Sequence, residues 1–114
     1  MHHFGNEELE LLKRVVESKK LMRYRGGESG FTMDFESKIC QRLKVKHALT
    51  LNSGTNALYC AMTAMGVGSG DEVIIPAFTW VATPMAPLLA GAVPVIADID
   101  ETLAIDPEDI ERKI

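Results

Sequence analysis

Residues 72–98 read EVIIPAFTWVATPMAPLLAGAVPVIAD, and this stretch decides the fold. Two short apolar runs, Glu72–Ile75 and Val93–Asp98, flank a segment that reads as a helix from about Trp80 or Ala82 to Leu89. Two strands joined by a helix predict a parallel pair, because parallel strands need a crossover connection of this kind. The run Val73-Ile74-Ile75 fits a strand that is buried on both faces.

The same stretch is long enough to span a bilayer, since residues 73–97 contain no charged side chain. Four prolines interrupt it, however: Pro76, Pro84, Pro87 and Pro94. An internal proline removes a helical N–H donor and clashes with the preceding turn, at a cost of ~3 kcal/mol. We therefore expect no transmembrane helix and no membrane partner.

Outward from this stretch, periodicity and capping residues predict further helices over residues 6–19, 32–43 and 55–65, with Asn6 and Thr32 capping the first two. Another helix opens at Asp106-Pro107, and residues 47–51 are expected to form a short strand. The alternation of strands and helices assigns the chain to the α/β class with a largely parallel sheet. The aperiodic residues 20–31 predict a flexible loop. The helices at 6–19 and 32–43 carry apolar stripes that we expect to lie in the core: Leu9, Leu12, Val15, Val16, Phe35, Ile39, Cys40 and Leu43.

Composition excludes several classes of function. The chain has 114 residues and a formal net charge of −4, so it lacks the basic surface that nucleic acids and anionic membranes require. Cys40 and Cys60 form no CxxC pair, which favours reduced thiols in a cytoplasmic protein. No metal site is expected at His2 and His3, nor in the acidic segment 98–109, which reads as a solvated loop followed by a helix cap.

The strongest local feature is the turn Asn52-Ser53-Gly54-Thr55 between a predicted strand and a predicted helix. A helix N-terminus offers free N–H groups and partial positive charge, so Gly54, Thr55 and Asn56 could hold a phosphate. The residues alone favour an ordinary glycine turn with a threonine cap. The turn is neither a P-loop nor a G-x-G-x-x-G fingerprint, because the lysine and the glycine spacing are missing.

Trp80 is the only tryptophan, and it follows the carboxyl end of a predicted strand. Ligands bind at that edge in open α/β sheets, where an indole could stack on a flat heteroaromatic ring. A core tryptophan with a satisfied N–H group is the alternative, and the residues alone leave both interpretations open.

An ordered series of blocks now resembles a known family, the DegT/StrS-type sugar aminotransferases of the aspartate-aminotransferase fold. The blocks lie at residues 45–48, 52–58, 66–76, 78–83, 91–95, 98–100 and 105–108, and include Asn52-Ser53-Gly54-Thr55, Phe78-Thr79-Trp80 and Ile105-Asp106-Pro107-Glu108. The set covers essentially the whole chain, and the region before Thr32 matches most loosely.

The resemblance implies that the chain holds part of the large pyridoxal-phosphate (PLP) domain of such an enzyme. Residues 1–31 would form an N-terminal helix and a Gly-rich loop, and residues 32–114 the first, incomplete portion of that domain. In the family, the Ser-Gly-Thr turn binds the phosphate of PLP, here Gly54, Thr55 and Asn56, and the aromatic residue of the Phe-Thr-Trp block stacks on the pyridine ring, here Trp80. Substrates would be a nucleotide-linked or related ketosugar and glutamate or glutamine, in a cytoplasmic homodimer.

The resemblance also implies what is missing. The family's Schiff-base lysine and the aspartate facing the pyridine nitrogen would lie beyond Ile114, and no lysine here stands in the family's lysine motif. The final helix also stops after about two turns, as in a truncated chain. We therefore expect no catalytic residue in this chain and no transamination by it alone. The alternative function is a non-catalytic module that binds phosphate or PLP, or that serves interaction only.

Overall fold

The computed structural model describes residues 4–23 and 30–114, which fall into two compact units that divide between Thr50 and Leu51. We call residues 4–23 and 30–50 the first unit and residues 51–114 the second unit, and describe each by itself. The expected boundary after residue 31 concerns the domains of a complete enzyme and stays a prediction.

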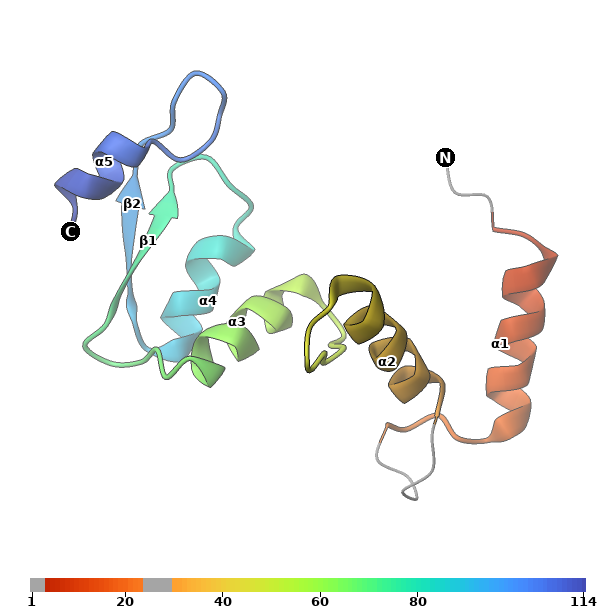
Figure 1. Ribbon diagram of the computed structural model, residues 1–114. Coiled ribbons are helices and arrows are strands. Elements are labelled where there is room, and N and C mark those ends of the chain that lie inside the picture. The colour runs from red at the N-terminus through yellow and green to blue at the C-terminus, as the bar shows by residue number, and fades with distance from the viewer. Residues whose placement is uncertain (1–3, 24–29) are drawn as a thin grey trace. The chain divides into compact units, whose positions relative to one another are not determined.

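The second unit is the α/β part of the chain (Figure 1). Its elements are α3 (Gly54–Ala64), β1 (Glu72–Pro76), α4 (Ala82–Ala90), β2 (Val93–Ala97) and α5 (Pro107–Arg112). β1 and β2 pair in parallel, with Glu72 opposite Val93 and Pro76 opposite Ala97. α4 connects the two strands, so the crossover predicted from residues 72–98 is confirmed.

The core of the second unit lies where α4 packs against α3 and the two strands. Its buried residues are mostly small: Ile75, Ala82, Ala86, Pro87, Ala92 and Ala97. Alanine on a helix face lets the neighbouring backbone approach closely, and Ala86 and Ala97 are 0% exposed. Gly91 ends α4 in the left-handed conformation (φ 87°), which the sequence predicts from its glycine at the helix end.

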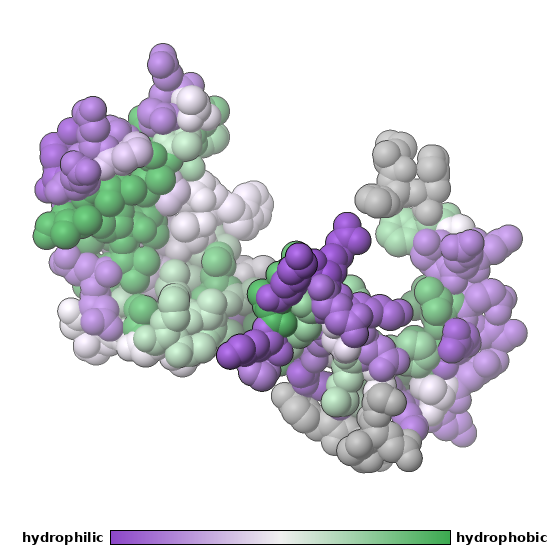
Figure 2. All heavy atoms as spheres, in the orientation of Figure 1, coloured by the Kyte–Doolittle hydropathy of each residue, from purple (hydrophilic) through white to green (hydrophobic). Residues whose placement is uncertain are grey.

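The sheet is covered incompletely. Val93 and Ile96 remain more than half exposed, the latter at 60%. Figure 2 shows hydrophobic residues gathered over the part of the second unit that contains the strands. A two-stranded sheet with one helix layer thus leaves apolar area in contact with solvent.

The first unit contains α1 (Asn6–Ser18) and α2 (Phe31–Leu43). Both predicted N-caps are misplaced: Gly5 caps α1, one residue before Asn6, and Gly30 caps α2, two residues before Thr32. Asn6 and Thr32 are therefore helical residues and not caps. At α1 a helical residue, Glu8, completes the cap. Its carboxylate Oε2 accepts a 2.7 Å hydrogen bond from the N–H of the N-cap residue, Gly5.

Two further expectations, one about residues 47–51 and one about the faces of α1 and α2, are wrong. Residues 47–51 form no strand, since a strand needs a hydrogen-bonded neighbour and the described residues supply none there. The apolar stripes of α1 and α2 are also not core: α1 has no buried residue, and Leu12 is 61% exposed. The periodicity is correct, but the described chain provides no surface for these faces to pack on.

In the described part of the first unit, the buried side chain is a carboxylate and not an apolar group. Glu36, on α2, is only 7% exposed. Its Oε1 accepts hydrogen bonds from the N–H (2.7 Å) and the hydroxyl (2.8 Å) of Thr50, and it forms an ion pair with the Arg23 guanidinium. The Arg23 side chain, followed by the Thr50 N–H, lowers the pKa of Glu36 from 4.5 to about 2. This polar cluster anchors residues 47–50 without a sheet.

No helix in residues 4–23 and 30–114 has the length and apolarity needed to cross a membrane. Within the same residues, no group of three His, Cys, Asp or Glu side chains could hold a metal ion. Cys40 and Cys60 are free and half-buried. The histidines at positions 2 and 3 lie outside the described residues, as do residues 24–29, half of the predicted loop at 20–31.

Candidate functional site

The second unit contains a hollow of about 530 Å³ that is built from two helix starts. The first turn of α3 contributes one wall, and the entry to α4 contributes the other. The lining residues are Gly54, Thr55, Ala57, Leu58, Trp80, Ala82 and Thr83. The structure thus brings three of the four predicted site residues, Gly54, Thr55 and Trp80, to one place.

The wall from α3 is suited to an anion. Gly54 and Thr55 are the first two residues of the helix, where backbone N–H groups have no helical carbonyl to bond. α3 has no acidic residue in its first turn, so its positive end is not neutralised locally. A Cβ built on Gly54 would meet no atom within 4 Å, which leaves open space in front of this backbone.

Asn56 lies outside the hollow, and its polar groups are occupied. Its backbone N–H donates to the hydroxyl of Ser53, the N-cap residue, at 3.2 Å. Its side-chain amide donates to Asn52 Oδ1 at 2.7 Å. An anion would have to displace the Ser53 hydroxyl to use this N–H group.

Trp80 forms the opposite wall and is 77% exposed. In this chain it is therefore not a core residue. Its backbone is held at the helix entry, where the Trp80 carbonyl accepts a 2.9 Å bond from the Thr83 N–H. An exposed indole beside the hollow offers an apolar, flat surface of the kind that stacking on a planar ring requires.

Thr83 is a lining residue that the sequence reasoning missed. Its hydroxyl lies 2.9 Å from the hydroxyl of Thr79, and this pair brackets Trp80 in the sequence. Two hydroxyls four residues apart at a helix start are the signal that could have identified it. Thr83 adds a polar group to a wall that is otherwise apolar.

None of the residues that line the hollow has a titratable side chain. The hollow can therefore bind and orient a ligand, but these residues cannot carry a proton to or from a substrate.

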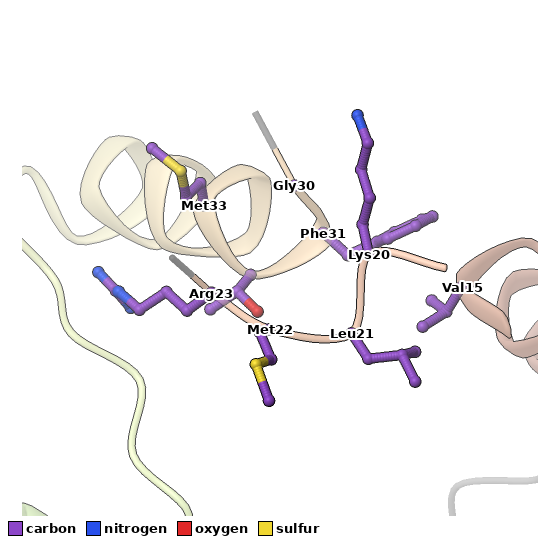
Figure 3. A pocket seen from close by; sticks show the side chains of 9 residues that line it. Val15, Lys20, Leu21, Met22, Arg23, Gly30, Phe31 and Met33 are labelled. Carbon is purple, nitrogen blue, oxygen red and sulfur yellow. The ribbon is translucent and has the colours of Figure 1, made fainter. Parts of the chain in front are cut away.

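The first unit contains smaller hollows, of about 320, 300 and 70 Å³, and Figure 3 shows the smallest of these three. It lies between the end of α1 and the start of α2, and Val15, Leu21 and Phe31 are among its lining residues. It has room for a few water molecules and holds none of the predicted site residues. The hollow of the second unit is therefore the candidate site.

Known proteins resemble this chain over almost all of its length. The model of the DegT/DnrJ/EryC1/StrS aminotransferase family matches residues 3–114. GDP-perosamine synthase of Vibrio cholerae is 49% identical over 81 residues, which are 70% of this chain and 22% of that protein. The L-glutamine:2-deoxy-scyllo-inosose aminotransferase of Streptomyces kanamyceticus is 41% identical over 110 residues, 93% of this chain and 26% of that protein. The chain therefore spans about a quarter of the length of these relatives.

Solved structures agree with this assignment. The aminotransferase of Psychrobacter cryohalolentis matches with a TM-score of 0.85 and 33% identity, over 96% of this chain and 27% of that one. Other matched structures were solved in PLP and PMP forms. The matches confirm the α/β fold expected from the alternation of elements. The chain belongs to the DegT/DnrJ/EryC1/StrS aminotransferase family.

Proposed function

We propose that this chain is the N-terminal part of a PLP-dependent aminotransferase that acts on a nucleotide-linked or related ketosugar, with glutamate or glutamine as amino donor. Family membership supports the reaction class. The names of the two relatives support the substrates, since one contains a GDP-linked compound and the other L-glutamine. The complete enzyme would be a cytoplasmic homodimer.

One observation carries the cofactor assignment: a single hollow is lined by the first turn of α3 and by the exposed indole of Trp80. PLP combines a phosphate dianion with a flat heteroaromatic ring, so it needs an anion site and a stacking surface within one molecular length. The volume of about 530 Å³ lies within the range of cofactor pockets. The residues present fit the group.

In this arrangement the N–H groups of Gly54 and Thr55 would donate to phosphate oxygens, and the Thr55 hydroxyl would add a third donor. The Trp80 indole would cover one face of the ring and exclude water from it. Bound PLP supplies an electron sink that stabilises negative charge on the carbon beside the transferred nitrogen. Proton transfer and covalent attachment of the cofactor would come from residues outside the hollow's lining, because none of these is titratable.

The test uses the complete enzyme and two substitutions, Trp80→Ala and Thr55→Val. Loss of stacking worth about 0.5–1.5 kcal/mol should weaken PLP binding by roughly 3- to 10-fold in Trp80→Ala. Loss of a hydrogen bond to a charged phosphate, about 1.5–3 kcal/mol, should weaken it by more than 10-fold in Thr55→Val. PLP affinity is measured by absorbance titration, and thermal stability is measured alongside it.

Val81→Ala is the matched control, since Val81 is exposed next to Trp80 and does not line the hollow. Unchanged PLP affinity in both test variants would overturn the site. A collapse of thermal stability with unchanged affinity would instead make Trp80 a folding residue. If the complete enzyme binds PLP but transfers no amino group from glutamate or glutamine to a ketosugar, the non-catalytic binding module replaces the enzyme.

A further inference from the structure

The peptide group between Ala97 and Asp98 is held from both sides. Its carbonyl oxygen, on Ala97, accepts a 2.8 Å hydrogen bond from the Ala77 N–H. Its N–H, on Asp98, donates a 2.7 Å hydrogen bond to the carboxylate Oδ2 of Asp109. Because a peptide group is planar and rigid, the carboxylate and the Ala77 N–H are connected through a single stiff unit.

Asp109 is well suited to hold that unit. Asp109 lies on α5 and is only 5% exposed. Arg112 approaches its Oδ1 with Nε at 3.2 Å and Nη2 at 3.1 Å, and Lys113 Nζ lies 3.5 Å from its Oδ2. The Asp98 N–H, followed by the Arg112 hydrogen bond and the two cationic charges, lowers the pKa of Asp109 against the opposing effect of desolvation. The carboxylate is therefore charged at neutral pH, and a charged acceptor strengthens the hydrogen bonds of the peptide that it polarises.

The other end of the connection is the segment that carries Trp80. Ala77 directly follows β1, and its bond to Ala97 continues the parallel pairing one step beyond Pro76. Three residues later Trp80 lines the hollow, and its carbonyl is fixed by the Thr83 N–H at 2.9 Å. The segment 77–80 is thus anchored at its start by the 97–98 peptide and at its end by α4.

We propose that Asp109 is a positioning residue for the cofactor hollow: its carboxylate fixes the 97–98 peptide, which fixes Ala77 and hence the placement of Trp80. The proposal rests on the proposed function, since it assigns Asp109 an effect on PLP binding through the indole. Asp109 itself does not line the hollow.

The experiment is a double-mutant cycle for PLP affinity in the complete enzyme, with Asp109→Asn, Trp80→Ala and the combination of both. Loss of the charge in Asp109→Asn should weaken PLP binding by about three- to tenfold when Trp80 is present. In the Trp80→Ala background the same substitution should have no further effect, because the group on which Asp109 acts is gone. Equal weakening in both backgrounds would overturn the proposal, as would unchanged affinity in Asp109→Asn.

Asp100→Asn is the matched control. Asp100 lies in the loop between β2 and α5, and its carboxylate accepts from the Thr102 N–H at 2.8 Å and the Thr102 hydroxyl at 2.5 Å and not from the 97–98 peptide. We expect Asp100→Asn to leave PLP affinity unchanged; a loss as large as in Asp109→Asn would show a general effect of the loop and contradict the proposal.

Hydrogen exchange of the Ala77 amide in the apoprotein supplies a second readout that does not need PLP. Exchange should be about three- to tenfold faster in Asp109→Asn than in Asp100→Asn. If the wild-type enzyme fails to bind PLP, the proposed function is lost, while unchanged exchange at Ala77 would separately overturn the role of Asp109. If Asp109→Asn does not fold, Asp109→Glu keeps the charge and displaces the carboxylate, and the same two readouts decide.

Discussion

The two units of this chain are held together by different forces. In the second unit, α4 packs small apolar side chains against α3 and two paired strands, and Ala86 and Ala97 are fully buried. In the described part of the first unit, the one buried residue is the carboxylate of Glu36. One unit has an apolar core, and the other has a polar cluster with exposed apolar helix faces.

The difference shows that an amphipathic sequence pattern alone does not produce a buried core. α1 has its leucines and valines at helical spacing, as α4 has its alanines. Only α4 finds a surface to cover, because its connection to both strands places it on them. The following three substitutions test this contrast, from the largest expected effect to the smallest.

Ala86→Asp should destabilise the second unit most. The new carboxylate would be buried without a partner, at a cost of about 3 kcal/mol or more in the free energy of unfolding. Urea denaturation of the complete protein measures the change. Leu89→Asp is the control on the same helix, since Leu89 is about half exposed. Equal losses in the two variants would show that α4 has no buried face.

Glu36→Gln should remove a pH dependence from the first unit. Because the folded-state pKa of Glu36 is about 2 against an ordinary value of 4.5, its stabilisation is fully present above pH 4.5 and is lost as the pH falls toward 2. The variant should be less stable than the parent chain at neutral pH and should lose less on acidification across that window. Circular dichroism of the 114-residue chain against pH measures both.

Glu8→Gln is the control for that experiment, because Glu8 makes one exposed hydrogen bond to Gly5, which lowers its pKa. Parallel acid profiles for Glu36→Gln and the parent chain would contradict a role for Glu36 in holding residues 47–50.

Leu12→Ala should have the smallest effect. With Leu12 at 61% exposure, the change in unfolding free energy of the 114-residue chain should stay within about 0.5 kcal/mol. Ile75→Ala, in the buried strand β1, is the reference at about 2–5 kcal/mol. A loss at Leu12 close to that of Ile75 would mean that α1 already buries this face.

Local signals explain what could be predicted. The elements of residues 72–97 follow from two apolar runs, a glycine at position 91 and the need for a crossover. The cap at Asp106 was also predicted, and its side chain accepts from the Glu108 N–H at 2.9 Å. Such signals lie within a few residues of the structure that they specify.

The sequence-based errors have different physical causes. A strand at 47–51 was predicted from local composition, but strands exist only with partners. The helix caps are misplaced by one residue at α1 and by two at α2, because Asn and Thr are common caps and the glycines just before them are accepted there too. At the site, the sequence did not predict that Thr83 lines the hollow. Nor did it predict that the Asn56 N–H donates to the Ser53 hydroxyl.

By itself the sequence determined the order of the elements in the second unit, the parallel crossover and the family of the chain. These features depend on local signals, namely helical periodicity, turn residues and ordered motifs. Each signal lies within a short stretch of sequence, so it can be recognised without a structure. Only the tertiary structure decided that Gly54 and Thr55 meet Trp80 at one hollow, that Asp109 reaches the 97–98 peptide, and that the stripe of α1 stays exposed. These outcomes depend on residues far apart in the chain, because burial and hydrogen bonding require a partner surface as well as a pattern.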